Sequence, residues 1–175
     1  MSAGRKNFNR IFARVSPVFV MLAVALLCPV LTTRVFAEVT ASVKRQAAGT
    51  QFAKAEEQRA LLNSKPGDKR TLGDYKQVVT SYRRVYLITP HATEVPDSLL
   101  AVAELYTEMG DRFGRSYYQS AVDSYLFLAH EYPKSKVCQD AYLRAARLQK
   151  DQLGERAQAR KNYEEFLHTI QRSSS

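Results

Sequence analysis

Apolar and polar positions follow a helical period in three separate stretches of the chain. Each stretch places a small or branched residue first, an aromatic residue four positions later and a large apolar residue three positions after that: Val78, Tyr82 and Val85; Ala121, Tyr125 and Leu128; Ala159, Tyr163 and Phe166. Positions i, i+4 and i+7 lie along one side of a helix with 3.6 residues per turn. The pattern therefore predicts an internal repeat of helices, each with one apolar stripe to bury.

Prolines and glycines separate the predicted helices. Pro90 and Pro133 follow the first two stripes at the same distance, and proline both lacks an amide donor and disfavours helical angles in the residue before it. Lys65-Pro66-Gly67-Asp68 has the composition of a turn, and Gly154 separates the last two segments. These signals predict six helices, at about residues 41–64, 71–89, 97–109, 116–132, 135–153 and from 155 onward. Six helices make three hairpins.

The first of these helices has a less regular apolar face. Its apolar residues Ala48, Phe52, Ala55 and Leu62 fall on one side, and Arg59 interrupts them. Because no proline breaks this stretch, we expect one continuous helix whose apolar face packs on its neighbours.

Three helix ends carry local signals. Thr71 stands three residues before Asp74, and Ser116 three residues before Gln119, which is the spacing of a capping box. Gly110 is expected to close the third helix, because glycine adopts the left-handed conformation without steric cost.

The middle stripe resembles a known repeat. Ala121, Tyr125, Leu128 and Pro133 match the second half of the tetratricopeptide repeat (TPR) pattern, and a group upstream resembles its first helix: Leu99, Val102, Ala103, Tyr106 and Gly110. The resemblance implies an all-α fold, a TPR-like right-handed solenoid of three helical hairpins after an N-terminal signal helix. The long-helix variety of this repeat is found in bacterial envelope proteins, so the resemblance also implies a protein–protein interaction or scaffolding module without catalysis of its own.

A narrower resemblance offers an alternative. Tyr82-Arg-Arg-Val-Tyr, Ala101-Val-Ala-Glu-Leu-Tyr-Thr-Glu-Met-Gly110 and Tyr163-Glu-Glu-Phe-Leu are similar to the N-terminal TPR region of certain cell-wall N-acetylmuramoyl-L-alanine amidases. This similarity covers about residues 41–170 and no catalytic motif. It implies that the chain is the front portion of a zinc-dependent peptidoglycan hydrolase whose catalytic domain lies elsewhere.

The first 37 residues have the pattern of an export signal. Arg5, Lys6, Arg10 and Arg14 precede a run from Val15 through Thr33 that carries no charge, and Val35-Phe36-Ala37 supplies small residues for cleavage before Glu38. An uncleaved membrane anchor is the alternative, because the uncharged run is close to the length that spans a bilayer. The expected domains are residues 1–37, signal peptide or anchor, and 38–175, a helical repeat domain in the periplasm or cell envelope.

Charge and candidate chemistry exclude several functions. Residues 1–37 hold five of the 26 basic residues and none of the 17 acidic ones, so residues 38–175 carry 21 − 17 = +4 rather than the +9 of the whole chain. An exported protein meets no nucleic acid, so we expect no such partner. His91, His130 and His168 are the only imidazoles, and no zinc-binding or nucleotide-binding motif occurs. We therefore expect no cofactor, no metal and no catalysis from this chain alone.

Aromatic and basic residues supply a candidate binding surface. The chain has ten tyrosines and no tryptophan, and tyrosine gives a large amphipathic contact area. The candidate partner-binding residues are Tyr75, Tyr118, Tyr142, Arg144 and Arg147. The alternative is that such aromatics serve packing, which we expect of Tyr82, Tyr106, Tyr125 and Tyr163. The expected partner is a protein or peptide of the cell envelope, including one associated with peptidoglycan. Membrane contact is expected only through residues 1–37, if they are not cleaved.

Overall fold

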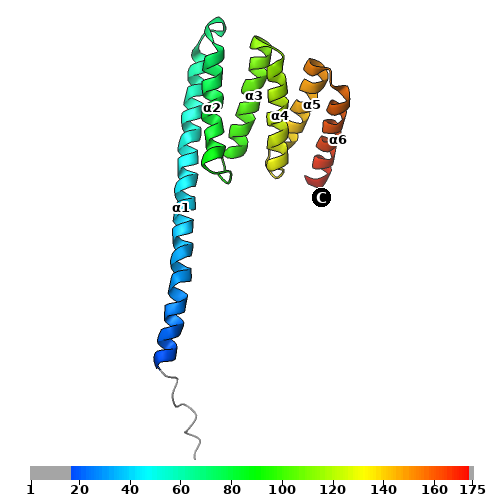
Figure 1. Cartoon of the computed structure of the whole chain (residues 1–175). Helices are drawn as coiled ribbons and strands as arrows, with labels where there is room; N and C mark the ends of the chain where they lie inside the picture. Colours follow the sequence, from blue (N-terminus) through cyan, green and yellow to red (C-terminus); the bar gives the residue numbers. More distant parts are fainter. Residues whose placement is uncertain (1–16, 174–175) are drawn as a thin grey trace, which may run out of the picture. The chain divides into compact units, whose positions relative to one another are not determined.

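All secondary structure in the part of the chain that the structure describes is helical (Figure 1). The structure is a computed structural model that describes the backbone of residues 17–173 and the side chains of residues 38–171. Its α-helices are α1 (Pro17–Ser64), α2 (Leu72–Ile88), α3 (Val95–Phe113), α4 (Ser116–Glu131), α5 (Cys138–Leu148) and α6 (Arg156–Ser173). A short 3-10 helix, η1 (Gly67–Lys69), follows α1, and a π-helical turn, η2 (Gln149–Leu153), follows α5. The all-α prediction is confirmed, with no strand among residues 17–173.

The chain divides into two units, Met1–Ser42 and Val43–Ser175. The first unit contains the beginning of α1, and the predicted signal peptide or anchor at residues 1–37 lies outside the residues whose side chains are described. Within residues 38–171, no helix combines the length and apolar character needed to cross a membrane.

In the second unit, each helix packs on the next one along the chain. α2 packs on α3, α3 on α4, α4 on α5 and α5 on α6, and Figure 1 shows these helices side by side in that order. The predicted face of α1 is confirmed, because Ala48, Ala55 and Leu62 are buried and Phe52 packs against both core clusters.

The stripes of the repeat supply the core. One cluster surrounds Tyr82 and the other surrounds Tyr125, and both tyrosines are at most 2% exposed. All six residues of the first two stripes are buried, whereas in the third only Ala159 is buried and Tyr163 and Phe166 are half-buried. The third copy therefore covers its apolar side less completely than the first two.

The capping box at the start of α2 is confirmed. The Thr71 hydroxyl oxygen accepts a hydrogen bond from the Asp74 amide at 3.2 Å, and the Asp74 carboxylate accepts one from the Thr71 amide at 2.9 Å. Lys65 donates to the same carboxylate at 2.7 Å. The hydrogen bonds from Lys65 and then from Thr71 lower the pKa of Asp74 to about 2, because they stabilise the ionised form.

Two predicted helix ends are wrong. Gly110 does not close α3, which continues to Phe113 and ends before Gly114; instead Gly110 is buried inside the helix. A Cβ atom at Gly110 would stand 2.4 Å from Cδ1 of Tyr118, so the glycine allows the α4 tyrosine to approach the α3 backbone. Ser116 forms no capping box because it is already the first residue of α4, and no side chain caps the start of this helix.

The fifth helix ends differently from its prediction. It is α-helical to Leu148 and then widens into η2. Gly154 follows η2 and has a φ of 71°. Gln149 in this turn is buried, and its side-chain oxygen accepts a hydrogen bond from Asn162 of α6 at 2.6 Å. The predicted separation of the last two helices at Gly154 is confirmed, and glycine suits that left-handed conformation.

Candidate partner-binding site

Two of the predicted binding residues lie in the interior. Tyr75 is fully buried and packs edge to face against Phe113, with ring centroids 5.6 Å apart. The ring of Tyr118 is buried against Gly110, and its hydroxyl donates to Asp111 at 2.6 Å. The prediction that Tyr75 and Tyr118 contribute to a partner-binding surface is therefore wrong, because helix packing covers both rings.

The other three predicted residues lie on α5 and are accessible. Tyr142 is half-buried, and Arg144 and Arg147 are exposed. Tyr142 lines a broad hollow of about 1180 Å³, which we call the α4–α6 hollow. Its lining comes from α4, the following loop, α5 and α6: Leu126, Ala129, His130, Pro133, Lys134, Ser135, Lys136, Cys138, Gln139, Tyr142, Asn162, Glu165 and Thr169. The predicted set is thus not one surface, and only its α5 members remain candidates.

Arg144 belongs to a bridge that joins three helices. Glu104 of α3 binds Arg59 of α1 at 3.0 Å through one carboxylate oxygen and Arg144 of α5 at 3.1 Å through the other. Burial opposes the charged form of Arg59, but the hydrogen bond with Glu104 and its negative charge outweigh it, so the pKa of Arg59 is raised. These side chains are 22 to 44% exposed, so each pair contributes on the order of 1 kcal/mol or less.

A second hollow, not predicted from the sequence, has an apolar floor. We call it the α2–α4 groove; its volume is about 430 Å³, and it is lined by Arg83, Tyr86, Leu87, Leu99, Val102, Tyr106, Ser120, Asp123, Ser124 and Phe127. Leu99 and Val102 of α3 are buried beneath it. Leu87 of α2 is 75% exposed and Phe127 of α4 is 40% exposed. When a partner covers large apolar side chains that are exposed at such a hollow, the free energy of the complex is lowered.

The two sides of the α2–α4 groove, formed by α2 and α4, are joined by an aromatic pair and carry opposite charges. Tyr86 and Phe127 form an edge-to-face pair across α2 and α4, with ring centroids 5.6 Å apart and planes at 80°. Arg83 comes from α2 and Asp123 from α4. This arrangement suits a partner whose apolar side chain is flanked by two polar groups. Those groups would meet Arg83 and Asp123 and so fix the direction in which the partner lies.

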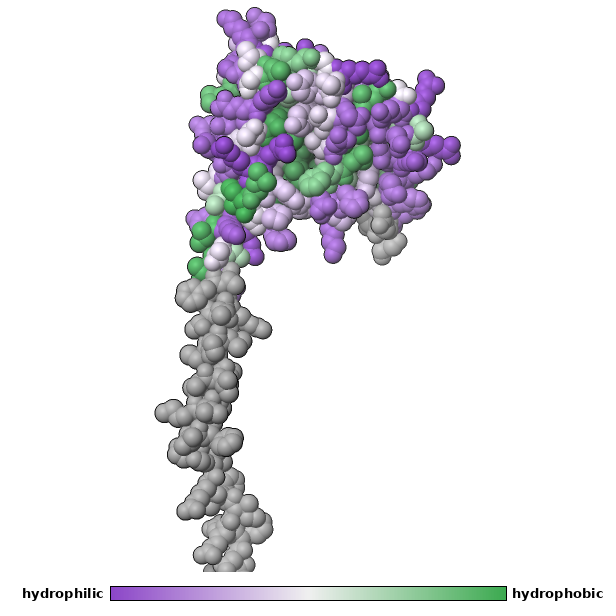
Figure 2. All heavy atoms as spheres, viewed as in Figure 1, coloured by the Kyte–Doolittle hydropathy of each residue, from purple (hydrophilic) through white to green (hydrophobic). Residues whose placement is uncertain are grey.

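Sequence reasoning missed this groove for an identifiable reason. Tyr86, Leu87 and Phe127 lie outside the i, i+4, i+7 stripes, so the helical pattern assigns them no packing role. The available signal was that Leu87 and Phe127 are large apolar residues on the faces opposite or beside those stripes. Figure 2 shows hydrophobic side chains at the surface among hydrophilic ones on one face of the molecule.

The described residues offer little for catalysis or metal binding. Among residues 38–171, no group of three or more His, Cys, Asp or Glu side chains is placed to hold a metal ion. His91, His130 and His168 are exposed, and Cys138 is buried against Ala129. The accessible features described above are grooves and charged side chains.

Comparison with known proteins adds no family. No protein-family model, no curated protein and no solved structure matches the chain. The similarities to TPR proteins and to amidases therefore stay predictions from the sequence.

Proposed function

We propose that the chain is an exported, non-catalytic, TPR-like module for protein–protein interaction or scaffolding in the bacterial cell envelope. In this proposal the six helices form a right-handed solenoid of three hairpins. The observation that supports it is the succession of helices in which each packs on the next, with the stripe tyrosines Tyr82 and Tyr125 each buried in a core cluster. Repeat arrays of this kind present extended binding surfaces.

The α2–α4 groove is the surface on which we place the partner. It holds Leu87, the most exposed of the large hydrophobic side chains within the described residues, next to Phe127. Burying apolar area of this kind is worth about 25 cal/mol per Å² before the costs of association. A protein or peptide of the envelope with an apolar anchor fits this groove.

Site-specific photocrosslinking in cells of the native host tests the proposal. A photoreactive amino acid at position 87 should yield a discrete crosslinked product in the envelope fraction. The same group at Lys161, an exposed position on α6, serves as the matched control. The product at position 87 should disappear when Phe127→Asp is introduced. Equal crosslinking at both positions, or a product only in the cytoplasmic fraction, would contradict the proposed site or the proposed location.

The alternative, the front portion of an N-acetylmuramoyl-L-alanine amidase, rests on the sequence similarity alone. Reading the gene beyond the codon for Ser175 distinguishes the two, because the alternative requires a zinc-binding catalytic domain in the same frame. An adjoining hydrolase domain would make the helical array its targeting region.

A further inference from the structure

A groove runs between α1 and α2, and none of its lining residues is shared with the α2–α4 groove. It consists of two adjoining hollows, of about 350 Å³ and about 360 Å³, which share Gln58 of α1 and Gln77 of α2. We call the pair the α1–α2 groove. Its two ends differ in chemistry, and each end indicates what the groove can hold.

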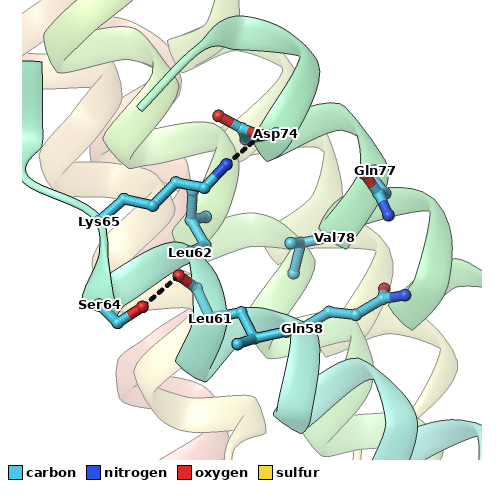
Figure 3. A pocket seen from close by; sticks show the side chains of 8 residues that line it. All are labelled: Gln58, Leu61, Leu62, Ser64, Lys65, Asp74, Gln77 and Val78. Carbon is cyan, nitrogen blue, oxygen red and sulfur yellow. Dashed lines mark hydrogen bonds and ion pairs between the residues drawn. The ribbon is translucent and has the colours of Figure 1, made fainter. Parts of the chain in front are cut away.

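One end of the α1–α2 groove is apolar. Leu61, Leu62 and Val78 line it, and Leu61 is 61% exposed whereas the other two are buried. Figure 3 shows Gln58 and Leu61 of α1 and Val78 of α2 around this hollow. The ion pair between Lys65 and Asp74, 2.7 Å long, lies at the far side of this hollow.

The other end is basic. Lys54 of α1 and Lys76 and Arg84 of α2 line it together with uncharged polar residues. No carboxylate lines this hollow, and within the described residues none of the three cations has an ion-pair partner. Three unpaired positive charges around one hollow attract an anionic ligand, and the attraction weakens as salt screens it.

Between the two ends lies an acceptor without a donor. The side-chain oxygen of Gln58 is buried and has no hydrogen-bond partner among the described residues. A buried polar atom of this kind costs free energy until a donor reaches it. The backbone amide of a peptide laid in the groove is such a donor once the Gln58 side chain turns its oxygen toward the groove.

We propose that the α1–α2 groove binds an acidic peptide segment that carries an apolar side chain. The carboxylates lie at Lys54, Lys76 and Arg84, the apolar side chain covers Leu61, and a backbone amide donates to Gln58. A second copy of this chain is a poor occupant. Its most exposed apolar side chain on α6, Leu167, shares that helix with three cations that the basic end would repel: Arg156, Arg160 and Lys161. The same helix carries Glu164 and Glu165, but Glu164 is already paired with Arg160 at 3.0 Å, so the positive charge of the helix exceeds its negative charge.

Selection from a displayed library of random peptides tests this inference on the full chain, immobilised through its C-terminus. Enriched peptides should contain Asp or Glu together with Leu, Ile, Val or Phe. A synthetic peptide of the enriched sequence should bind in fluorescence anisotropy, and raising NaCl from about 0.05 M to about 0.5 M should weaken binding more than tenfold. Selection that enriches no peptide, or only peptides without acidic residues, would overturn the proposal.

Charge reversals locate the binding. Lys54→Glu with Arg84→Glu should weaken the peptide more than tenfold, whereas Arg156→Glu with Lys161→Glu, which changes the net charge equally, should leave the affinity within about threefold. Equal losses in both variants would show a general charge effect and refute the site. Circular dichroism establishes that both variants keep their helices.

Two further measurements test the hydrogen bond to Gln58 and the class of ligand. Gln58→Leu should weaken the peptide by about threefold to tenfold, which is the value of one hydrogen bond. Vesicles of phosphatidylglycerol that bind the wild type and not the Lys54 and Arg84 variant, while no peptide does, would assign the groove to an anionic membrane surface and overturn the peptide. The crosslinking test at Leu87 is unaffected by any of these results, so the two sites stand or fall separately.

Discussion

Replacing Gly110 with alanine tests the close approach of α4 to α3. A Cβ atom at this position would lie 2.4 Å from Cδ1, 2.5 Å from Cε1 and 2.8 Å from Cγ of Tyr118. Contacts this short require the ring to move. The ring is buried and its hydroxyl is held by Asp111 at 2.6 Å, so it cannot move without losing packing or that hydrogen bond.

Two opposing effects set the magnitude. Alanine in a helix interior is favoured over glycine by about 1 kcal/mol. Overpacking of a buried site costs about 1–3 kcal/mol, and disturbing the Tyr118 hydrogen bond adds about 1 kcal/mol. We therefore expect Gly110→Ala to lower the free energy of unfolding by about 1–3 kcal/mol, which corresponds to a fall in Tm of about 2–12 °C for a chain of this length.

Urea denaturation followed by circular dichroism measures this change. Gly73→Ala is the matched control, because the nearest atom to a Cβ at this α2 glycine is the Thr71 hydroxyl oxygen at 3.7 Å, an ordinary contact. The control should be neutral or stabilising by up to about 1 kcal/mol. In a Tyr118→Ala background, Gly110→Ala should become stabilising by about 1 kcal/mol, which gives a coupling energy of about 2–4 kcal/mol.

If Gly110→Ala stabilised the otherwise unchanged protein as much as Gly73→Ala does, this would refute a packing role for Gly110. Additivity of the Gly110 and Tyr118 substitutions would refute it as well. Either result would show that the packing of the Tyr118 ring does not depend on the absence of a side chain at Gly110.

Three other predictions follow from the core, the cap and the N-terminus. Tyr125→Ala should lower the free energy of unfolding by about 3–5 kcal/mol, because the ring is 2% exposed; a change below about 0.5 kcal/mol in denaturation would contradict its core position. The pKa of Asp74 in the folded state, about 2, lies below its ordinary 3.8, so its stabilisation is present above pH 3.8 and is lost as pH falls through 2. The stability difference between wild type and Asp74→Asn should therefore shrink between pH 5 and pH 2, and a difference that stays constant would disprove the capping interaction. N-terminal sequencing of the exported protein should begin at Glu38, and full-length protein in the membrane fraction would indicate an uncleaved anchor instead.

The helices themselves could be predicted from the sequence because their signals are local. Each of the stripes around Tyr82 and Tyr125 spans about two helical turns, and the cap formed by Thr71 and Asp74 spans about one turn. Interactions over so short a span depend on residue identity and spacing, which the sequence contains. The all-α class, the six helices and the end before Gly154 followed from them.

The candidate site could be predicted only in small part. Tyr142, Arg144 and Arg147 are accessible as expected, but Tyr75 and Tyr118 are buried, because the neighbouring helices cover faces that helical periodicity leaves undefined. Nothing in the spacing indicated that the α2–α4 groove would form.

What the tertiary structure alone decided involves residues far apart in the chain. Gly110 reads in sequence as a helix end, and only the approach of Tyr118 from α4 makes it a packing position. Arg59 reads as an interruption of an apolar face, and only the placement of Glu104 on α3 gives it a partner. The sequence by itself determined that these segments form helices and which stripes α2 and α4 bury, since both depend on neighbours within a few residues. The tertiary structure determined which remaining faces meet, which charges pair and which grooves stay open, since these depend on how successive helices cross.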